Sequence, residues 1–128
     1  MIPAFTVACS NERQAFGRSI GAFQAVQHPL AETATELEQI RLLTAKAAWL
    51  QSNGRDCATE AAMAKLAATE VAIRATDRCM RVLGAFGLVE VSAMERLFRD
   101  ARLGPFSPIS NEMVRNFVGE RLGLQRSY

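Results

Sequence analysis

The longest hydrophobic pattern in the chain runs from Ile20 to Gln51 and predicts a long core helix. Its apolar or small residues recur in alternating steps of three and four, which places them on one helix face. They are Phe23, Val26, Leu30, Thr33, Leu37, Ile40, Thr44 and Ala47. Because Pro29 has no amide hydrogen, we expect it to kink this helix or mark a restart, with His28 extended. Asn53-Gly54 is typical of a left-handed cap that ends the helix.

A second long helix is predicted from Asp56, a suitable N-cap, to about Leu83. Small side chains dominate its inner face and allow close helix packing. This face carries Ala64, Ala67, Ala68, Val71, Ala75, Cys79 and Val82. Gly84 and Gly87 bracket the turn that follows.

Shorter helices are predicted at both ends of the chain. Residues from about Pro3 to Glu12 form a short first helix, which we interpret as the remainder of a longer one. Ser92-x-x-Glu95 is a capping box that starts a helix ending near Arg102.

The last predicted helix follows the Gly104-Pro105 stop and is capped by Ser110 or Asn111. Gly123 ends it. Its apolar face carries Met113, Val114, Phe117, Val118 and Leu122.

The fold class that follows is all-α, a mostly antiparallel up-and-down helical bundle. Almost half of the residues are hydrophobic, and Gly and Pro are sparse, which favours helices over a β-rich fold. We find no internal repeat, low-complexity segment or linker, so residues 1–128 are expected to form one domain.

Charge and cysteine content narrow the possible partners. The 15 basic and 13 acidic residues are interspersed, so no basic stripe is available for a nucleic-acid backbone. No apolar run is long enough to span a membrane, and the amino terminus lacks the basic region of a signal peptide. Cys9, Cys57 and Cys79 have no metal-binding spacing. We expect them to be reduced and buried in a cytoplasmic protein.

Residues for independent catalysis are sparse. His28 is the one histidine, which excludes metal sites built on several histidines, and we interpret it as structural. Glu36 and Glu38 fall on different helix faces, and Glu32 with Glu36 is expected to be a solvated edge. No residue is therefore assigned as catalytic.

Five segments, in order and over nearly the whole chain, resemble the carboxy-terminal helical domain of the acyl-CoA dehydrogenases. The first and last are Arg13-x-x-Phe16-Gly17-x-x-Ile20-x-x-x-Gln24-x-x-x-x-x-Leu30-Ala31 and Glu95-Arg96-Leu97-Phe98-Arg99-Asp100-Ala101-Arg102. Between them stand Arg41-Leu42-x-x-x-x-Ala47-Ala48, Ala62-Met63-Ala64-Lys65-Leu66 and Glu70-Val71-Ala72. The resemblance implies an FAD flavoenzyme of fatty acid metabolism that dehydrogenates an acyl-CoA thioester between its α and β carbons. In such enzymes a glutamate removes the α proton.

The resemblance also implies flavin contacts. Arg13, Phe16 and Gln24 stand where the family places residues against the pyrophosphate and adenosine part of FAD, often that of the adjacent subunit. Arginine offers a planar charged fork to phosphate, and phenylalanine an apolar face. In the alternative interpretation, Arg13 caps a helix end and Phe16 fills the core.

A second flavin-contacting segment is implied at 81–87. Gly84 lies within it, Arg81 replaces the family's usual glutamine, and Ala85 replaces a glycine. Further along, Ser110 replaces a threonine and Glu112 a glutamine. A carboxylate at position 112 would repel FAD phosphates unless it is paired or points away.

The catalytic position departs from the family pattern. Pro108 occupies the place where many members carry the catalytic glutamate, and proline cannot accept a proton. Relatives that supply the base from the helix before the Arg13 motif use a position upstream of this chain. We therefore expect a carboxy-terminal portion of a dehydrogenase, inactive alone, that contacts FAD and forms a dimer or tetramer. It would meet acyl-CoA only together with the missing domains.

Two alternatives remain open. The chain could be a non-catalytic small subunit that pairs with a larger dehydrogenase subunit. It could also be a helical interaction module without flavin binding.

Overall fold

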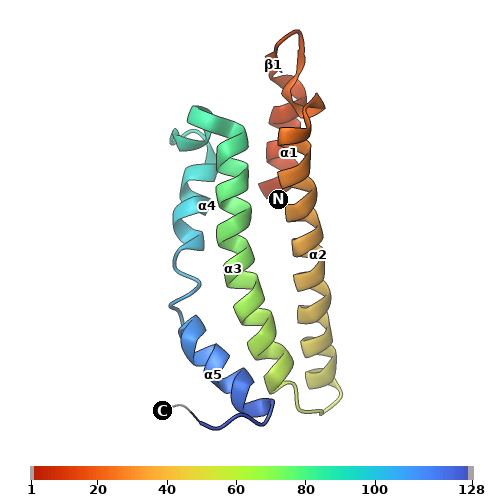
Figure 1. Cartoon of the computed structure of the whole chain (residues 1–128), viewed down its shortest axis with the longest axis vertical. Coiled ribbons are helices and arrows are strands. Elements are labelled where there is room, and N and C mark those ends of the chain that lie inside the picture. Colours follow the sequence, from red (N-terminus) through yellow and green to blue (C-terminus); the bar gives the residue numbers. More distant parts are fainter. Residues whose placement is uncertain (1, 127–128) are drawn as a thin grey trace.

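The computed structural model describes residues 2–126, so the ends of the predicted domain 1–128 lie outside the described part (Figure 1). Within these residues the fold is all-α, as predicted, except for one small hairpin. The elements are α1 (Ile2–Glu12), β1 (Gln14–Ala15), β2 (Arg18–Ser19), the 3-10 turn η1 (Ile20–Ala22), α2 (Gln24–Ser52), α3 (Ala58–Leu83), the 3-10 turn η2 (Gly84–Leu88), α4 (Ala93–Ala101) and α5 (Asn111–Arg121).

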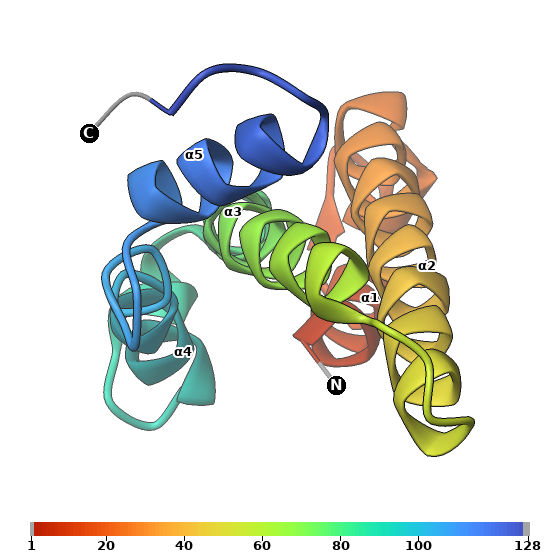
Figure 2. The same cartoon turned by 90° about the horizontal axis from the view of Figure 1, so that it is seen from below.

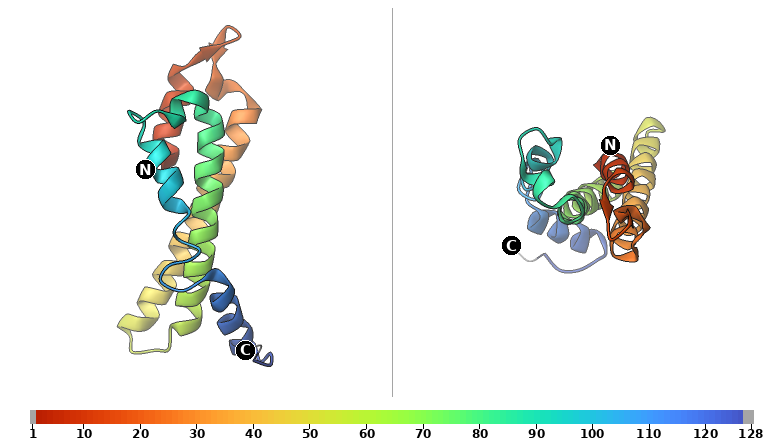
Figure 3. Two further views of the ribbon diagram at one scale, coloured as in Figure 1. Left: turned by 90° about the vertical axis from the view of Figure 1, so that its left-hand side faces the viewer. Right: turned by 90° about the horizontal axis from the view of Figure 1, so that it is seen from above.

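Helix α3 is the axis of the bundle and packs against all four other α-helices. Helix α2 runs antiparallel to it on one side, while α4 and α5 follow one another along its other side (Figures 1 and 2). Helix α1 lies beside the half of α3 that also meets α4 (Figure 3). One end of this elongated bundle therefore has four helices around its core, and the other has three.

One cluster of buried hydrophobic side chains lies in the four-helix end. Leu30 of α2 meets Cys79 and Leu83 of α3 and Met94 of α4, all of them buried. Half-buried side chains surround this cluster, namely Cys9, Val26, Met80, Leu97 and Phe98. The predicted inner faces of the two long helices are confirmed here.

The same face of α2 is only partly covered further along the helix, where Ala47 is buried. Leu37 is exposed although it lies on the predicted core face. Further along, a groove of about 410 Å³ separates α2 from α3. Its lining is mostly small residues: Thr44, Ala47, Ala48, Gln51, Cys57, Ala61, Ala64, Lys65 and Ala68. At this end of the bundle the hydrophobic face of α2 is therefore only partly covered.

The start of α2 differs from the prediction. The helix begins at Gln24, after the η1 turn, and continues through Pro29 without a restart. His28 is helical, so the extended geometry predicted for it is wrong. Leu30 and Thr33 are buried beside the proline, and their packing outweighs the local preference of the residue before it.

Helix ends follow the sequence signals more closely. Gly54 has a φ of 67°, and the amide of Arg55 donates to Leu50 O at 2.9 Å, so the predicted left-handed cap is confirmed. Helix α3 starts at Ala58, two residues after Asp56, because Cys57 holds the N-cap position. The Asp56 carboxylate still accepts from the Ala58 amide at 3.0 Å.

The capping box of α4 is only half formed. Ser92 Oγ accepts from the Met94 amide at 3.2 Å, as an N-cap side chain should. The Ser92 amide donates to Val89 O at 2.8 Å, and the Glu95 carboxylate pairs with Arg99 instead. The reciprocal bond predicted for Glu95 is therefore replaced by an ion pair within the helix.

A β-hairpin that the sequence analysis did not predict joins α1 to α2. Gln14 pairs with Ser19 and Ala15 with Arg18 in antiparallel register. Phe16 and Gly17 form the turn with φ values of 53° and 77°, both in the left-handed region of a type I′ turn. Strands of two residues carry no readable periodicity, so only the glycine hinted at the turn.

Ion pairs join α2 to α3 near the middle of the bundle. The Glu36 carboxylate lies 2.6 Å from Arg78 Nη1 and 3.1 Å from Arg74 Nη2, and Glu32 meets Arg78 Nη2 at 3.1 Å. The interpretation of Glu32 and Glu36 as a solvated edge holds for Glu32, whose side chain is 62% exposed, but is wrong for Glu36, which is 23% exposed and bridges to another helix.

The three cysteines are free thiols, but only Cys79 is buried. Desolvation, partly opposed by a hydrogen bond with Thr6, raises the pKa of the Cys79 thiol. Cys9 and Cys57 are half-buried, so the prediction of burial is wrong for these two. Among the described residues, no helix is both long and apolar enough to cross a membrane.

Candidate functional site

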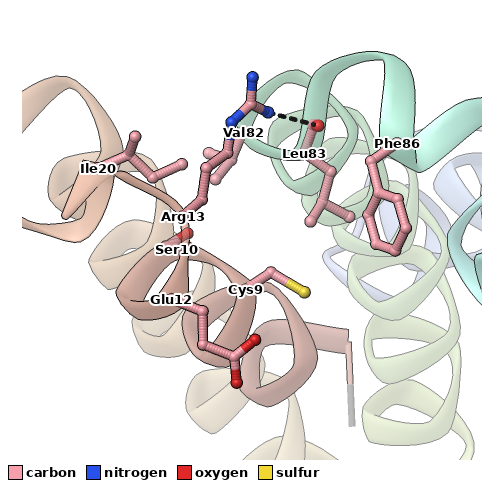
Figure 4. Close-up of a pocket in the computed structure, with 8 residues that line it drawn as sticks. All are labelled: Cys9, Ser10, Glu12, Arg13, Ile20, Val82, Leu83 and Phe86. Carbon is pink, nitrogen blue, oxygen red and sulfur yellow. Dashed lines mark hydrogen bonds between the residues drawn. The ribbon is translucent and has the colours of Figure 1, made fainter. Parts of the chain in front are cut away.

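Arg13 lies at the junction of α1, the hairpin and the end of α3. Its Nη1 atom donates to the carbonyl of Leu83 at 3.4 Å (Figure 4). This weak contact matches the alternative in which Arg13 caps a helix end. Among residues 2–126 no carboxylate forms an ion pair with Arg13, and the neighbouring Glu12 points away from Leu83. The guanidinium therefore presents an uncompensated positive charge at the surface.

Gly84 ends α3 directly beside this arginine. Its φ of 61° lies in the left-handed region that favours glycine. A Cβ atom at this position would lie 4.0 Å from Arg13 Nη1. That distance is an ordinary van der Waals contact, so the positive φ rather than the nearby arginine calls for glycine here.

One cavity beside Arg13 lies between α1 and α3. It measures about 340 Å³ and is mostly apolar. Its lining is Cys9, Ser10, Glu12, Arg13, Ile20, Val82, Leu83 and Phe86 (Figure 4). The Cys9 sulfur points towards Leu83 and Phe86, as the close-up shows.

A second cavity, which we call the hairpin cavity, lies on the other side of Arg13 and measures about 420 Å³. Four of the predicted flavin-contacting residues line it: Arg13, Phe16, Arg81 and Gly84. Ala15, Ile20, Phe23, Ala25, Val26 and Val82 complete its wall. The cavity combines two guanidinium groups with aromatic and aliphatic surface, which suits a ligand with both phosphate and ring portions.

Phe16 stands at the tip of the hairpin with 95% of its surface exposed, so the alternative that it fills the core is wrong. Its ring meets the Phe23 ring edge-on, with centroids 6.2 Å apart. On the Phe23 ring also lies the Arg18 guanidinium, 4.1 Å from the centroid. Sequence reasoning placed Phe23 on a core face and did not single out Arg18. The glycine after Phe16 was the sequence signal that could have indicated a turn here, and this turn brings Arg18 back towards the Phe23 ring.

Arg81 reaches the hairpin cavity from the last turn of α3. Its Nε atom pairs with the Asp77 carboxylate at 2.9 Å, one helical turn away. The side chain is nonetheless 79% exposed, so water screens this pair. Arg81 therefore adds positive charge to the site, less strongly than Arg13.

Gln24 and Ala85 lie close to this group but do not line either cavity. Gln24 is the first residue of α2, next to Phe23, and is exposed. Ala85 follows Gly84 in the η2 turn and is also exposed.

Ser110 and Glu112 lie elsewhere, at the start of α5. The start of α5 meets α3 at Lys65, whereas Arg13 meets it at Leu83. These positions are about 27 Å apart along the helix at about 1.5 Å per residue. One copy of the chain thus has two separate groups of predicted flavin contacts.

The second group has its own geometry. Ser110 Oγ accepts from the Met113 amide at 3.3 Å, which makes Ser110 rather than Asn111 the N-cap of α5. The Glu112 side chain is 76% exposed and lies 3.8 Å from Arg115 Nη1, so its charge is loosely paired. Pro108 is exposed in the loop before it.

Within residues 2–126 no three His, Cys, Asp or Glu side chains gather in a way that could hold a metal ion. His28 is exposed on α2 and lines neither cavity.

Comparison with known proteins gives a consistent result. Residues 4–123 match a family described as the C-terminal domain of acyl-CoA dehydrogenase. The acyl-CoA dehydrogenase FadE12 of Mycobacterium tuberculosis is 44% identical over 119 residues, which are 91% of this chain and 31% of that protein. The mitochondrial short-chain specific acyl-CoA dehydrogenase of Bos taurus is 41% identical over 116 residues, 91% of this chain and 28% of that protein.

A solved structure described as the FAD complex of PigA superposes with a TM-score of 0.93 at 25% identity, covering 96% of this chain and 32% of that one. The chain therefore spans about a third of the length of the relatives it matches.

Proposed function

The chain belongs to the acyl-CoA dehydrogenase family, whose C-terminal domain it matches, and from this premise we propose that it supplies FAD contacts and a self-association surface to such an enzyme. The reaction would be the α,β-dehydrogenation of an acyl-CoA thioester. When bound, the flavin would accept the hydride; the residues of this chain would bind and orient it.

The hairpin cavity carries the flavin proposal. Arg13 offers a guanidinium without a carboxylate partner, and Arg81 adds a second one on the same wall. Phe16 and Phe23 offer aromatic surface beside them. This combination of groups fits a dinucleotide. The two guanidinium groups can bind its pyrophosphate, and the two phenylalanine rings can pack against its adenine. PigA, which has the same fold over this domain, was solved with FAD.

The separation of the two groups supports a shared site. Ser110 and Glu112 cannot meet the ligand of the hairpin cavity within one copy, because about 27 Å of α3 lies between the two groups. We therefore propose that each FAD is contacted by the Arg13 group of one copy and the Ser110 group of another.

Proton abstraction is assigned to no residue of this chain. Pro108 stands at the position where the family resemblance implies a glutamate. Dehydrogenation is therefore proposed only together with the rest of a dehydrogenase. The open groove between α2 and α3 favours a second candidate function, that of a non-catalytic subunit or interaction module that pairs with a larger flavoenzyme subunit.

A titration of residues 1–128 with FAD, followed by flavin fluorescence, tests the proposal. We expect saturable binding that weakens by about tenfold or more in Arg13→Ala, because a charge-assisted bond to phosphate is lost. Arg41→Ala is the matched control, since Arg41 is an exposed arginine that pairs with Glu38 within α2.

Equal weakening in the two variants would show that only net charge matters. If the wild-type chain does not bind FAD at high concentration, residues 1–128 do not hold flavin on their own, and assembly is the only function that this chain can itself support.

A further inference from the structure

Lys65 ties the start of α5 to the first third of α3. Its Nζ atom donates to Ile109 O and to Asn111 Oδ1, both at 2.6 Å. These acceptors stand on either side of Ser110, more than forty positions away in sequence. Lys65 thus makes two direct hydrogen bonds from α3 to the segment that carries Ser110 and Glu112.

Asn111 is built into this contact as an acceptor. It is 3% exposed, and Thr69 Oγ1 lies 3.1 Å from the same Oδ1 atom. Its backbone amide donates to Pro105 O at 2.8 Å and closes the loop before α5. Because Asn111 is the first residue of α5, fixing it fixes the direction in which the helix starts.

A second close contact holds the same loop. A Cβ atom added at Gly104 would lie 2.9 Å from Thr69 Cγ2, so the backbone packs directly on α3 there. The loop between α4 and α5 is therefore held at both ends, by Gly104 against Thr69 and by Asn111 against Lys65.

The charge of Lys65 does not serve the helix it touches. The amino end of α5 carries the positive end of the helix dipole, so a fixed cation beside it is electrostatically unfavourable. Within residues 2–126 no carboxylate forms an ion pair with this lysine. The contact therefore acts through the two hydrogen bonds of Lys65, which fix the position of the loop and the start of α5 relative to α3.

We propose that Lys65 is a positioning residue for the flavin-contacting segment: its ammonium group holds Ser110 and Glu112 in place against α3. The flavin part of this inference rests on the proposed function, whereas the anchoring can be measured without flavin. It also assigns Asn111 as the partner through which Lys65 acts.

Hydrogen exchange by mass spectrometry and FAD titration, both on residues 1–128, test the inference together. In Lys65→Met, which keeps the aliphatic stem, we expect about tenfold faster exchange confined to 105–112 and about tenfold weaker FAD binding. Lys65→Arg should restore most of both. The matched control is Arg121→Met, because Arg121 ties the other end of α5 to Thr59 and Asp56. It should leave exchange at 105–112 and FAD affinity unchanged.

Asn111→Leu provides a second route if Lys65→Met does not fold, since it removes the acceptor without changing α3. It should reproduce the faster exchange, and the double variant should be no worse than either single one. Unchanged exchange at 105–112 in Lys65→Met or Asn111→Leu overturns the anchoring. Faster exchange with unchanged FAD affinity overturns the positioning role. If the wild-type chain does not bind FAD, the proposed function fails, and exchange alone decides the anchoring.

Discussion

At the scale of single residues, the Glu36 carboxylate was expected to be a solvated surface charge, but it links α2 to α3 through ion pairs with Arg74 and Arg78. Desolvation is the largest single influence and raises its pKa, but the hydrogen bonds and charges of Arg78 and Arg74 together outweigh it. The pKa of Glu36 therefore lies below its ordinary value of 4.5. A lowered pKa means that the folded state prefers the charged form.

This gives a pH-dependent prediction for Glu36→Gln. The stabilisation by the ion pairs is fully present above the unfolded pKa of 4.5 and is lost as the pH falls through the lower folded pKa. At pH 7 we expect the variant to lose about 1 kcal/mol of unfolding free energy, measured by urea denaturation. The difference from the wild type should shrink steadily below about pH 4.5.

Glu38→Gln is the matched control, because among residues 2–126 Glu38 pairs only with Arg41, on the same exposed helix face. A loss for Glu38→Gln as large as that for Glu36→Gln would contradict a special role of the link between helices.

At the scale of elements, Ser92 and Glu95 stabilise α4 in two different ways, although the sequence pattern predicts a single capping box. Ser92 caps the helix, and Glu95 forms an ion pair within it. Ser92 is 1% exposed and its hydroxyl caps α4, whereas Glu95 takes no part in the cap. We expect Ser92→Ala to lower the unfolding free energy by about 1 kcal/mol. Glu95→Gln, which removes only an i, i+4 pair, should cost less than about 0.5 kcal/mol. Urea denaturation of the two variants measures both, and equal losses would indicate that the full capping box forms.

Most of the fold could be predicted at this scale, because long helices repeat their signal. The apolar period located the two long helices, and Gly54 and Ser110 located helix ends that the structure confirms. The hairpin was missed because its strands contribute two residues each. The helical state of His28 was missed because tertiary burial of Leu30 outweighed a local rule.

The candidate site was less predictable, since it depends on which ends of the elements meet. Arg13 and Phe16 were identified from the family resemblance, and the structure places them in one cavity with Arg81. Periodicity gave no hint that Phe23 turns towards Phe16. Nor did it show that Ser110 lies about 27 Å of helix away from this group.

At the scale of the whole molecule, the bundle is unevenly covered. Its four-helix end holds the buried cluster of Leu30, Cys79, Leu83 and Met94, while the three-helix end leaves the α2–α3 groove open. Large apolar side chains on α2 are also exposed, among them Leu42 and Trp49. Such surface is usually covered by another copy or a partner.

We therefore expect residues 1–128 to form a dimer or tetramer, measured by light scattering. In Ala48→Glu, a charge in the α2–α3 groove should shift the population towards monomer. Ala45→Glu is the matched control, because Ala45 is exposed on the same helix but does not line the groove. A monodisperse monomer for the wild type would contradict the expectation, and equal effects of the two substitutions would place the interface elsewhere.

The hairpin tip has a consequence for how this chain changes over evolutionary time. Phe16 keeps a left-handed backbone that bulky residues rarely adopt, and its ring lies almost wholly in water. Asparagine or glycine would suit the turn better, by a strain energy on the order of 1 kcal/mol. The fold alone would therefore favour replacement of this phenylalanine. In a descendant that no longer meets a ligand or partner at this tip, position 16 should be among the first to drift, which makes it a sensitive marker of lost binding.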